Sequence, residues 1–256
     1  TRKAAIALTL ALAAAGSLAA QTALPAATKA KAEAILTELD TLGDFSGGDF
    51  SALYTIVSQK PKEKDSVTQV RMFRRDDKEQ FAMLVMLPEV NKGQGYLREG
   101  DNVWFYDPTS RKFSFSSMKE NIQDSEAKNG DLTKRSLVDD YEVTSMTEGT
   151  LGKIAVWIID LKARSTEVSY ERIVLSVRKD KTMLLKQQDY SVSGRLMRTT
   201  LFPKYVELGG RLMPSQLLIV DELNPGERSQ MTMAEQSLDT LPDKVFTKAF
   251  LEQVNK

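Results

Sequence analysis

The spacing of apolar residues predicts one helix near the start of the chain and a long series of strands after it. Thr28 can cap the start of this helix and Gly43 its end. Between them, apolar residues recur every three or four positions and share one helical face: Ala32, Ile35, Leu36, Leu39 and Leu42.

From Ser51 to about Met118 the apolar period changes to two, which is typical of strands. Short segments with charged residues, Gly, Pro or Asp separate four β-rich runs: Leu53–Val57, Val67–Phe73, Gln80–Leu87 and Gly95–Tyr106. Lys119–Asp140 is polar and turn-rich, so we expect a long excursion there with one or two helical turns.

Further strand-like runs occupy most of the second half of the chain. They are Tyr141–Ser145, Lys153–Leu161, Tyr170–Val177, Met183–Val192, Arg195–Leu208, Arg211–Glu222 and Gln230–Leu238. Successive strands without alternating helices indicate an antiparallel meander. The stretch Pro242–Val254 predicts a short closing helix, capped by Asp243, whose inward residues are Val245, Phe246, Ala249 and Phe250.

Several predicted strands are apolar on both faces, whereas a half-solvated sheet would alternate. The runs concerned are Phe81–Leu87, Ile154–Ile159 and Leu217–Val220. Methionine is also plentiful, with 10 residues, and its flexible thioether suits surfaces that repack around variable apolar ligands. Two interpretations stay open: an ordinary packed core, or a cavity for an apolar ligand.

Composition excludes several kinds of chemistry. The chain has no cysteine and no histidine, so it lacks a thiol nucleophile, the commonest general base and the commonest metal ligand. With 35 basic and 35 acidic residues it lacks the basic balance of a nucleic-acid-binding protein. No metal-ligand spacing or phosphate loop is present, and we expect no cofactor, no metal, no catalytic residues and no nucleic-acid partner.

Residues 1–19 have the layout of a secretory signal peptide. Arg2 and Lys3 precede an apolar run from Ala4 to Ala15, and small residues follow. The run of about 12 residues is shorter than the ~20 that span a bilayer. We therefore expect a cleaved signal peptide and export of residues 20–256 as one soluble domain.

Two charged clusters offer candidate chemistry, and we interpret both as solvated surface. Asp139 and Asp140 are neighbours, so on a strand they would point to opposite faces and could not share a proton. Arg71, Arg74 and Arg75 are expected to solvate a turn or an edge strand.

The order of several motifs resembles LolA-like outer-membrane lipoprotein-sorting proteins, in particular the less characterised branch of that family. The stretch 95–113 is similar to the family's hairpin pattern through Gly95, Leu97, Gly100, Asp101, Trp104, Tyr106 and Pro108. The segments 130–143, 183–219 and 241–253 also resemble family regions, although Leu132 stands where Phe is usual and no serine separates Gly130 from Asp131.

The resemblance implies a mainly β fold: an incomplete antiparallel β-barrel of about eleven strands, with helices covering the open side. It also implies a non-enzymatic periplasmic carrier whose apolar half-barrel cavity shields the acyl chains of lipoproteins or free lipid during sorting to the outer membrane. An inner-membrane exporter complex and an outer-membrane acceptor would be its partners. From the two-sided apolar strands we expect this cavity lining: Met72, Phe81, Met83, Val85, Leu97, Trp104, Trp157, Ile173, Leu175, Leu184 and Leu201.

Two other functions stay open at this point. The same fold can serve as a periplasmic accessory or sensor subunit of a membrane exporter, because fold does not decide function. A hydrolase would have to act through carboxylates, and no spacing in the chain supports that.

Overall fold

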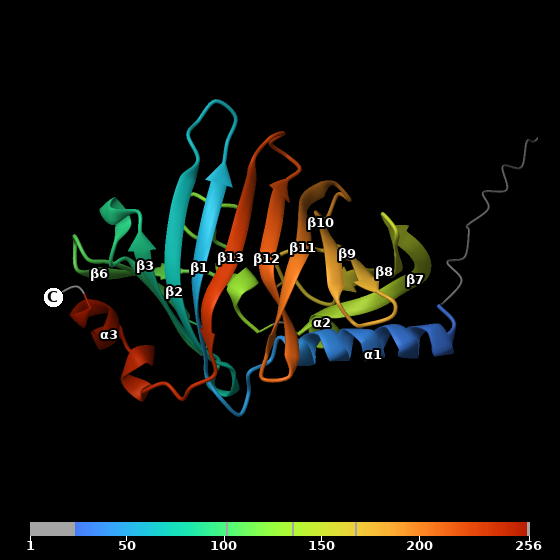
Figure 1. The fold of residues 1–256 in the computed structure, drawn as a ribbon, viewed down its shortest axis with the longest axis horizontal. Coiled ribbons are helices and arrows are strands. Elements are labelled where there is room, and N and C mark those ends of the chain that lie inside the picture. Colours follow the sequence, from blue (N-terminus) through green and yellow to red (C-terminus); the bar gives the residue numbers. More distant parts are fainter. Residues whose placement is uncertain (1–23, 101, 135, 167, 255–256) are drawn as a thin grey trace, which may run out of the picture.

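One antiparallel sheet of thirteen strands organises the chain in the computed structural model, which describes residues 24–254 except 101, 135 and 167 (Figure 1). The strand order is β6-β5-β4-β3-β2-β1-β13-β12-β11-β10-β9-β8-β7. The chain therefore starts at the middle of the sheet, runs outward to β6, crosses to β7 and returns inward until β13 pairs with β1. The sheet is not closed, since β6 and β7 form its two edges. The expected signal peptide, residues 1–19, lies outside the described residues.

The strands and helices have the following bounds. The strands are β1 Phe50–Gln59, β2 Ser66–Arg75, β3 Gln80–Leu87, β4 Gly95–Glu99, β5 Asn102–Asp107, β6 Lys112–Ser116, β7 Tyr141–Leu151, β8 Ile154–Ala163, β9 Arg172–Arg178, β10 Leu184–Tyr190, β11 Leu196–Leu208, β12 Arg211–Asp221 and β13 Arg228–Ser237. The α-helices are α1 Ala26–Leu42, α2 Leu137–Asp140 and α3 Lys248–Gln253, and the 3-10 helices are η1 Asp76–Lys78, η2 Glu89–Asn91, η3 Asn129–Leu132 and η4 Asp243–Phe246.

The predicted fold class is confirmed, with two strands more than the eleven expected. The run Gly95–Tyr106 divides at Gly100, whose φ of 57° turns the chain between β4 and β5. The short edge strand β6 follows, where Phe113 pairs with Tyr106 and Phe115 with Trp104.

Alternation along the strands defines an inner and an outer face of the sheet. The inner face carries the main core, for example Ile56 on β1, Met83 on β3 and Leu175 on β9. Register shifts interrupt the pairing of several neighbouring strands, including β10 with β11 and β11 with β12. Such bulges bend and twist a strand, which helps the sheet curve around its inner face.

Helix α1 covers one end of the inner face, below β8 to β12 in Figure 1. It buries Ala32 and Leu36, as the apolar pattern predicts, and Gly43 follows its last residue. The expected Thr28 cap is wrong: the helix begins at Ala26 after Pro25, whose fixed φ suits a helix start.

The connection between β6 and β7, residues 117–140, packs into the interior. It contains η3 and α2, which confirms the predicted excursion with short helical turns. Ile122, Ala127, Asn129 and Leu132 are all almost fully buried. This connection therefore fills part of the space that the curved sheet encloses.

A second, smaller core lies on the outer face of β3 to β5. Ala82, Leu97 and Tyr106 pack there against the C-terminal segment, which contributes Val245, Phe246 and Leu251. This explains why β3 is apolar on both faces, as the sequence indicated.

Three details of the sequence prediction are wrong in this region and on β12. The C-terminal segment is divided into η4 and α3, and Thr247, rather than Asp243, caps α3 by accepting the Phe250 N–H. Ala249 is exposed rather than inward. On β12 the outer-face residue Leu218 is only partly buried, so that strand is not covered on both sides.

Arg74 and Arg75 are buried in ion pairs, contrary to the expectation that they are solvated. Arg74 donates to both oxygens of Asp76, and Asp76 also accepts the Phe45 N–H at 2.9 Å. Arg75 makes two hydrogen bonds to Asp49 and one to the Leu241 carbonyl. These contacts join the end of α1, the β2–β3 turn and the C-terminal segment.

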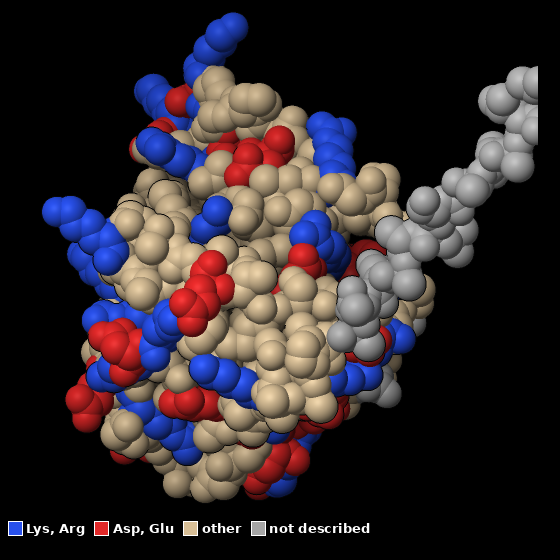
Figure 2. Space-filling model, turned by 90° about the vertical axis from the view of Figure 1, so that its right-hand side faces the viewer, with Lys and Arg blue, Asp and Glu red and all other residues tan. Residues whose placement is uncertain are grey.

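Surface charge is mixed on the face shown in Figure 2, where basic and acidic side chains alternate across largely uncharged surface. The described part of that face carries no continuous basic patch. Among the described residues, no helix is both long and apolar enough to cross a bilayer.

Candidate functional site

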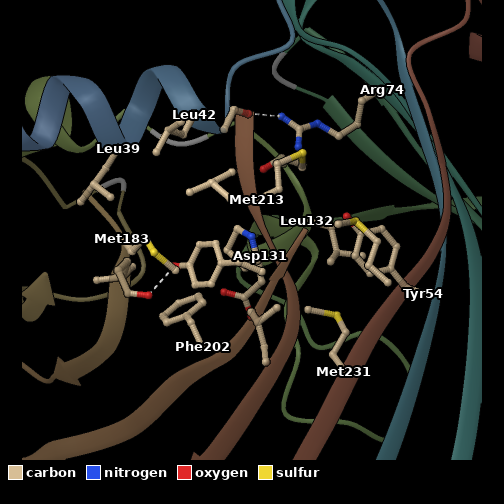
Figure 3. A pocket seen from close by; sticks show the side chains of 18 of the residues that line it. Leu39, Leu42, Tyr54, Arg74, Asp131, Leu132, Met183, Phe202, Met213 and Met231 are labelled. Atoms are coloured by element: carbon tan, nitrogen blue, oxygen red, sulfur yellow. Dashed lines mark hydrogen bonds between the residues drawn. The ribbon is translucent and has the colours of Figure 1, made fainter. Parts of the chain in front are cut away.

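An apolar cavity of about 140 Å³ lies between the inner face of the sheet and a roof made of α1 and the 117–140 connection (Figure 3). Strands β1, β2 and β10 to β13 form its walls. The lining consists of Leu39, Leu42, Gly43, Tyr54, Arg74, Asp131, Leu132, Thr133, Leu137, Met183, Leu184, Phe202, Tyr205, Leu212, Met213, Pro214, Leu217, Met231 and Met233.

Methionine is prominent in this lining. Met183, Met213, Met231 and Met233 all contribute, and Figure 3 shows three of them, Met183, Met213 and Met231, around one common space. Unbranched thioether side chains change rotamer easily, so such a lining can adapt to apolar ligands of different shape.

The polar groups of the lining are engaged with protein partners. Arg74 is paired with Asp76, and Asp131 is paired with Arg198. The Tyr205 hydroxyl donates to the Leu184 carbonyl. Burial raises the pKa of Tyr54 to about 12, so its phenol is neutral at ordinary pH. The cavity therefore offers apolar contact and no activated nucleophile or base.

At about 140 Å³, the cavity is too small for a long acyl chain. An engineered apolar cavity of about 150 Å³ in another protein binds benzene, a molecule of six carbons. A chain of sixteen or eighteen carbons needs several times that space.

Polar contacts at the edge of the roof hold it in place. Asp40 of α1 accepts the N–H groups of Leu137 and Val138 at 2.9 and 3.1 Å and so caps α2 from another helix. Glu38 accepts the Thr182 hydroxyl at 2.6 Å, and the Gly43 carbonyl accepts from Arg74 at 3.1 Å. Each contact joins roof residues to one another or to the sheet.

A buried ion-pair cluster anchors the connection to β11. Arg198 contacts both oxygens of Asp131 at 2.7 and 3.0 Å, and its Nε donates to Asp189 at 2.7 Å. Burial would lower the pKa of Arg198, but the two carboxylates outweigh it and hold that pKa well above its usual value.

An acidic cluster lies apart from the cavity. Carboxylate oxygens of Glu126, Asp221 and Glu227 lie within 4.8 Å of one another. Burial, and then repulsion from the other two, raises the pKa of Glu126. Asp221 accepts the N–H groups of Leu223 and Asn224, which is a turn-forming role. We assign this cluster a structural role.

The sequence-predicted lining residues fall into three groups. Leu184 lines the cavity, whereas Phe81 and Ile173 line neighbouring polar pockets. Others lie on the inner face but are packed in the core or at its margin: Met72, Met83, Val85, Leu175 and Trp157.

The third group lies on the outer face, so the expectation that it points inward is wrong. Leu97 belongs to the outer core, and Trp104 packs against that core beneath the Lys248 ammonium. Leu201 is partly exposed and lies between the inward residues Thr200 and Phe202. A shift of one residue exchanges the two faces of a strand, which accounts for these errors.

Most cavity residues were not among those predicted. Leu39 and Leu42 do lie on the apolar helix face that the sequence indicated, and the cavity methionines belong to its methionine excess. The apolar helix face and the methionine excess were visible in the sequence, but no sequence pattern indicated that a helix and an irregular connection would form the roof.

The curved open sheet with its helical roof is a LolA-like fold. Among solved structures, the chain is similar to the LolA superfamily protein NE2245 from Nitrosomonas europaea, with 23% identity, a TM-score of 0.75, and 86% of this chain and 98% of that chain covered. A DUF1329 family protein from Desulfovibrio piger is 20% identical, with a TM-score of 0.77 and coverage of 88% and 99%. A putative outer membrane lipoprotein-sorting protein domain from Vibrio parahaemolyticus is 17% identical, with a TM-score of 0.73 and coverage of 85% and 97%.

A protein-family model described as "-like: Uncharacterized protein" matches residues 77–253, and the chain belongs to that family. No curated protein matches the chain. The resemblance inferred from sequence motifs is thus confirmed at the level of the fold.

Proposed function

We propose that this protein is a non-enzymatic carrier that shields the acyl chains of lipoproteins or free lipid. The observation that supports the proposal is the methionine-rich cavity, whose walls are strands and whose roof is made of non-strand segments. Rigid walls with a separable roof suit a ligand that must be enclosed during transit and released afterwards.

The free energy of transfer sets the requirement for such a carrier. At ~0.8 kcal/mol per methylene, exposing one long acyl chain to water costs on the order of 10 kcal/mol. Nearly the whole chain must therefore be covered. We propose that α1 moves away from the sheet, and that the tail then extends from Phe202 along the inner face toward Leu175 and Trp157.

The proposed setting is the periplasm, after cleavage of residues 1–19 as a signal peptide. Residues 20–256 would act as one lipid-binding domain between an inner-membrane exporter complex and an outer-membrane acceptor. The carrier breaks no bond, in keeping with a lining that lacks an activated nucleophile. One solved neighbour is described as a putative outer membrane lipoprotein-sorting protein domain, which supports this setting by analogy.

A matched pair of variants on one strand tests the proposal. Leu217 lines the cavity, whereas Leu218 is its neighbour on the outer face of β12. We expect Leu217→Trp to occupy the cavity and weaken binding of a fluorescent fatty-acid probe at least about tenfold, while Leu218→Trp leaves binding unchanged. Mass spectrometry of the purified protein should also detect bound lipid. Absence of both probe binding and co-purified lipid would overturn the proposal.

A further inference from the structure

A polar pocket of about 270 Å³ adjoins the apolar cavity. The two share Asp131, Thr133 and Leu137 in their linings, so they lie against the same η3–α2 segment. The polar pocket is also lined by Lys119, Lys128 and Arg198. An apolar space and a cation-lined space therefore meet at one segment of the roof.

Lys128 is a half-buried cation of this pocket, and no ion pair is found for it among the described residues; Lys119 also has none there, but it is exposed. Arg198 is satisfied by Asp131 and Asp189, and Lys134, a further lining residue, is paired with Asp44 at 2.7 Å. Among the described residues, no carboxylate lies within ion-pairing distance of the Lys128 ammonium. Its nitrogen lies 4.6 Å from the centre of the Tyr170 ring.

The Lys128 ammonium is half-buried and lies near the Arg198 ion-pair cluster. Burial, and then repulsion from Arg198, lowers the pKa of Lys128, and the charges of Asp131 and Asp189 offset only part of this. An anion beside the ammonium would relieve both effects. Asp140, the remaining carboxylate of the lining, has an exposed side chain, where water and salt screen its charge.

We propose that Lys128 binds the phosphate or a similar oxyanion of an amphiphile whose tail enters the apolar cavity and continues along the inner face of the sheet, as proposed above. The inference rests on the proposed carrier function and extends it, because it assigns the ligand a class: an anionic lipid rather than a neutral one. The Tyr170 ring and Ser169 complete the surroundings of the head group.

Two lipids with the same tail test this assignment. We would measure calorimetric binding of oleoyl lysophosphatidic acid and of monooleoylglycerol, each below its micelle concentration, and of inorganic phosphate alone. A charge-assisted hydrogen bond is worth at least about tenfold in affinity. We therefore expect the wild type to bind the phosphate-bearing lipid about tenfold more tightly than the neutral one, with a preference that decreases as NaCl is raised.

Lys128→Gln should abolish this preference without weakening monooleoylglycerol binding, and Lys128→Arg should retain it. Lys153→Gln is the control and should keep the preference, because Lys153 is exposed and lines neither pocket. Equal affinities of the wild type for both lipids, or a preference that persists in Lys128→Gln, would overturn the head-group site and leave the carrier function intact.

Failure of both lipids to bind would overturn the carrier function itself. Inorganic phosphate that binds as tightly as the lysolipid would identify a free-phosphate site and overturn the amphiphile assignment. Should Lys128→Gln fail to fold, the wild-type preference and its salt dependence still decide.

Discussion

Arg198 on β11 and Asp131 on η3 form a two-point ion pair in the interior, with only 8% and 10% of their side chains exposed. These residues are 67 positions apart in sequence, and their pairing ties the β6–β7 connection to the far half of the sheet. Asp189, which is fully buried, is the second partner of Arg198. One guanidinium thus pairs with two buried carboxylates and neutralises one of their two charges.

Arg198→Met should therefore cost about 3–5 kcal/mol in the free energy of unfolding, because it removes the cation that is ion-paired with two buried carboxylates. Arg172→Met is the matched control, since Arg172 also pairs with a carboxylate, Asp160, but has 41% of its side chain exposed. The control should lose less than about 1 kcal/mol. Urea unfolding followed by circular dichroism gives both values. Equal losses for the two variants would show that burial does not govern the Arg198 contribution.

Sequence reasoning located the strands well because alternation is a local property of each segment. Gln80–Leu87, for example, coincides with β3. Which face of a strand points inward depends on contacts with distant segments, and this is why Leu97 and Leu201 were assigned to the wrong face. The buried role of Arg75 was also unpredictable, since its partners Asp49 and Leu241 are brought to it only by the folded chain.

Leu97→Ala tests the corrected placement of that residue. Leu97 is fully buried in the outer core, away from the cavity, so the substitution should cost about 2–5 kcal/mol of stability. It should leave the affinity of the folded protein for a fatty-acid probe unchanged. Chemical denaturation and probe titration measure the two effects separately. A clear loss of affinity in the folded variant would contradict this placement and show that Leu97 contributes to the binding site.

Asp40→Ala should loosen the roof. The Asp40 carboxylate accepts the N–H groups of Leu137 and Val138 at the start of α2, and loss of such a cap typically costs about 1 kcal/mol. Hydrogen exchange of residues 137–140 should become faster, while exchange in β1 and β13 stays slow. Asp40→Asn keeps an acceptor oxygen and should show a smaller increase. Unchanged exchange in Asp40→Ala would mean that α1 does not hold α2 in place.

Acid should release a second tie between the end of α1 and the connection, the ion pair of Asp44 with Lys134 at 2.7 Å. Burial raises the pKa of Asp44, but the Lys134 ammonium and hydrogen bonds from Ser46 outweigh it and lower that pKa to about 2. Because the folded-state pKa lies below 3.8, the ordinary value for an aspartate, the carboxylate stabilises the fold above about pH 4. That contribution is lost as the pH falls from 4 toward 2.

The difference in urea midpoint between wild type and Asp44→Asn measures this contribution directly. It should be constant from pH 7 to 5, correspond to about 1 kcal/mol or less because the pair is partly exposed, and shrink toward zero near pH 2. Lys134→Met should remove most of the same pH-dependent difference, because it removes one of the groups that lower the pKa. A difference that grows on acidification would reverse the sign of the linkage and show that the Asp44 carboxylate destabilises the folded state.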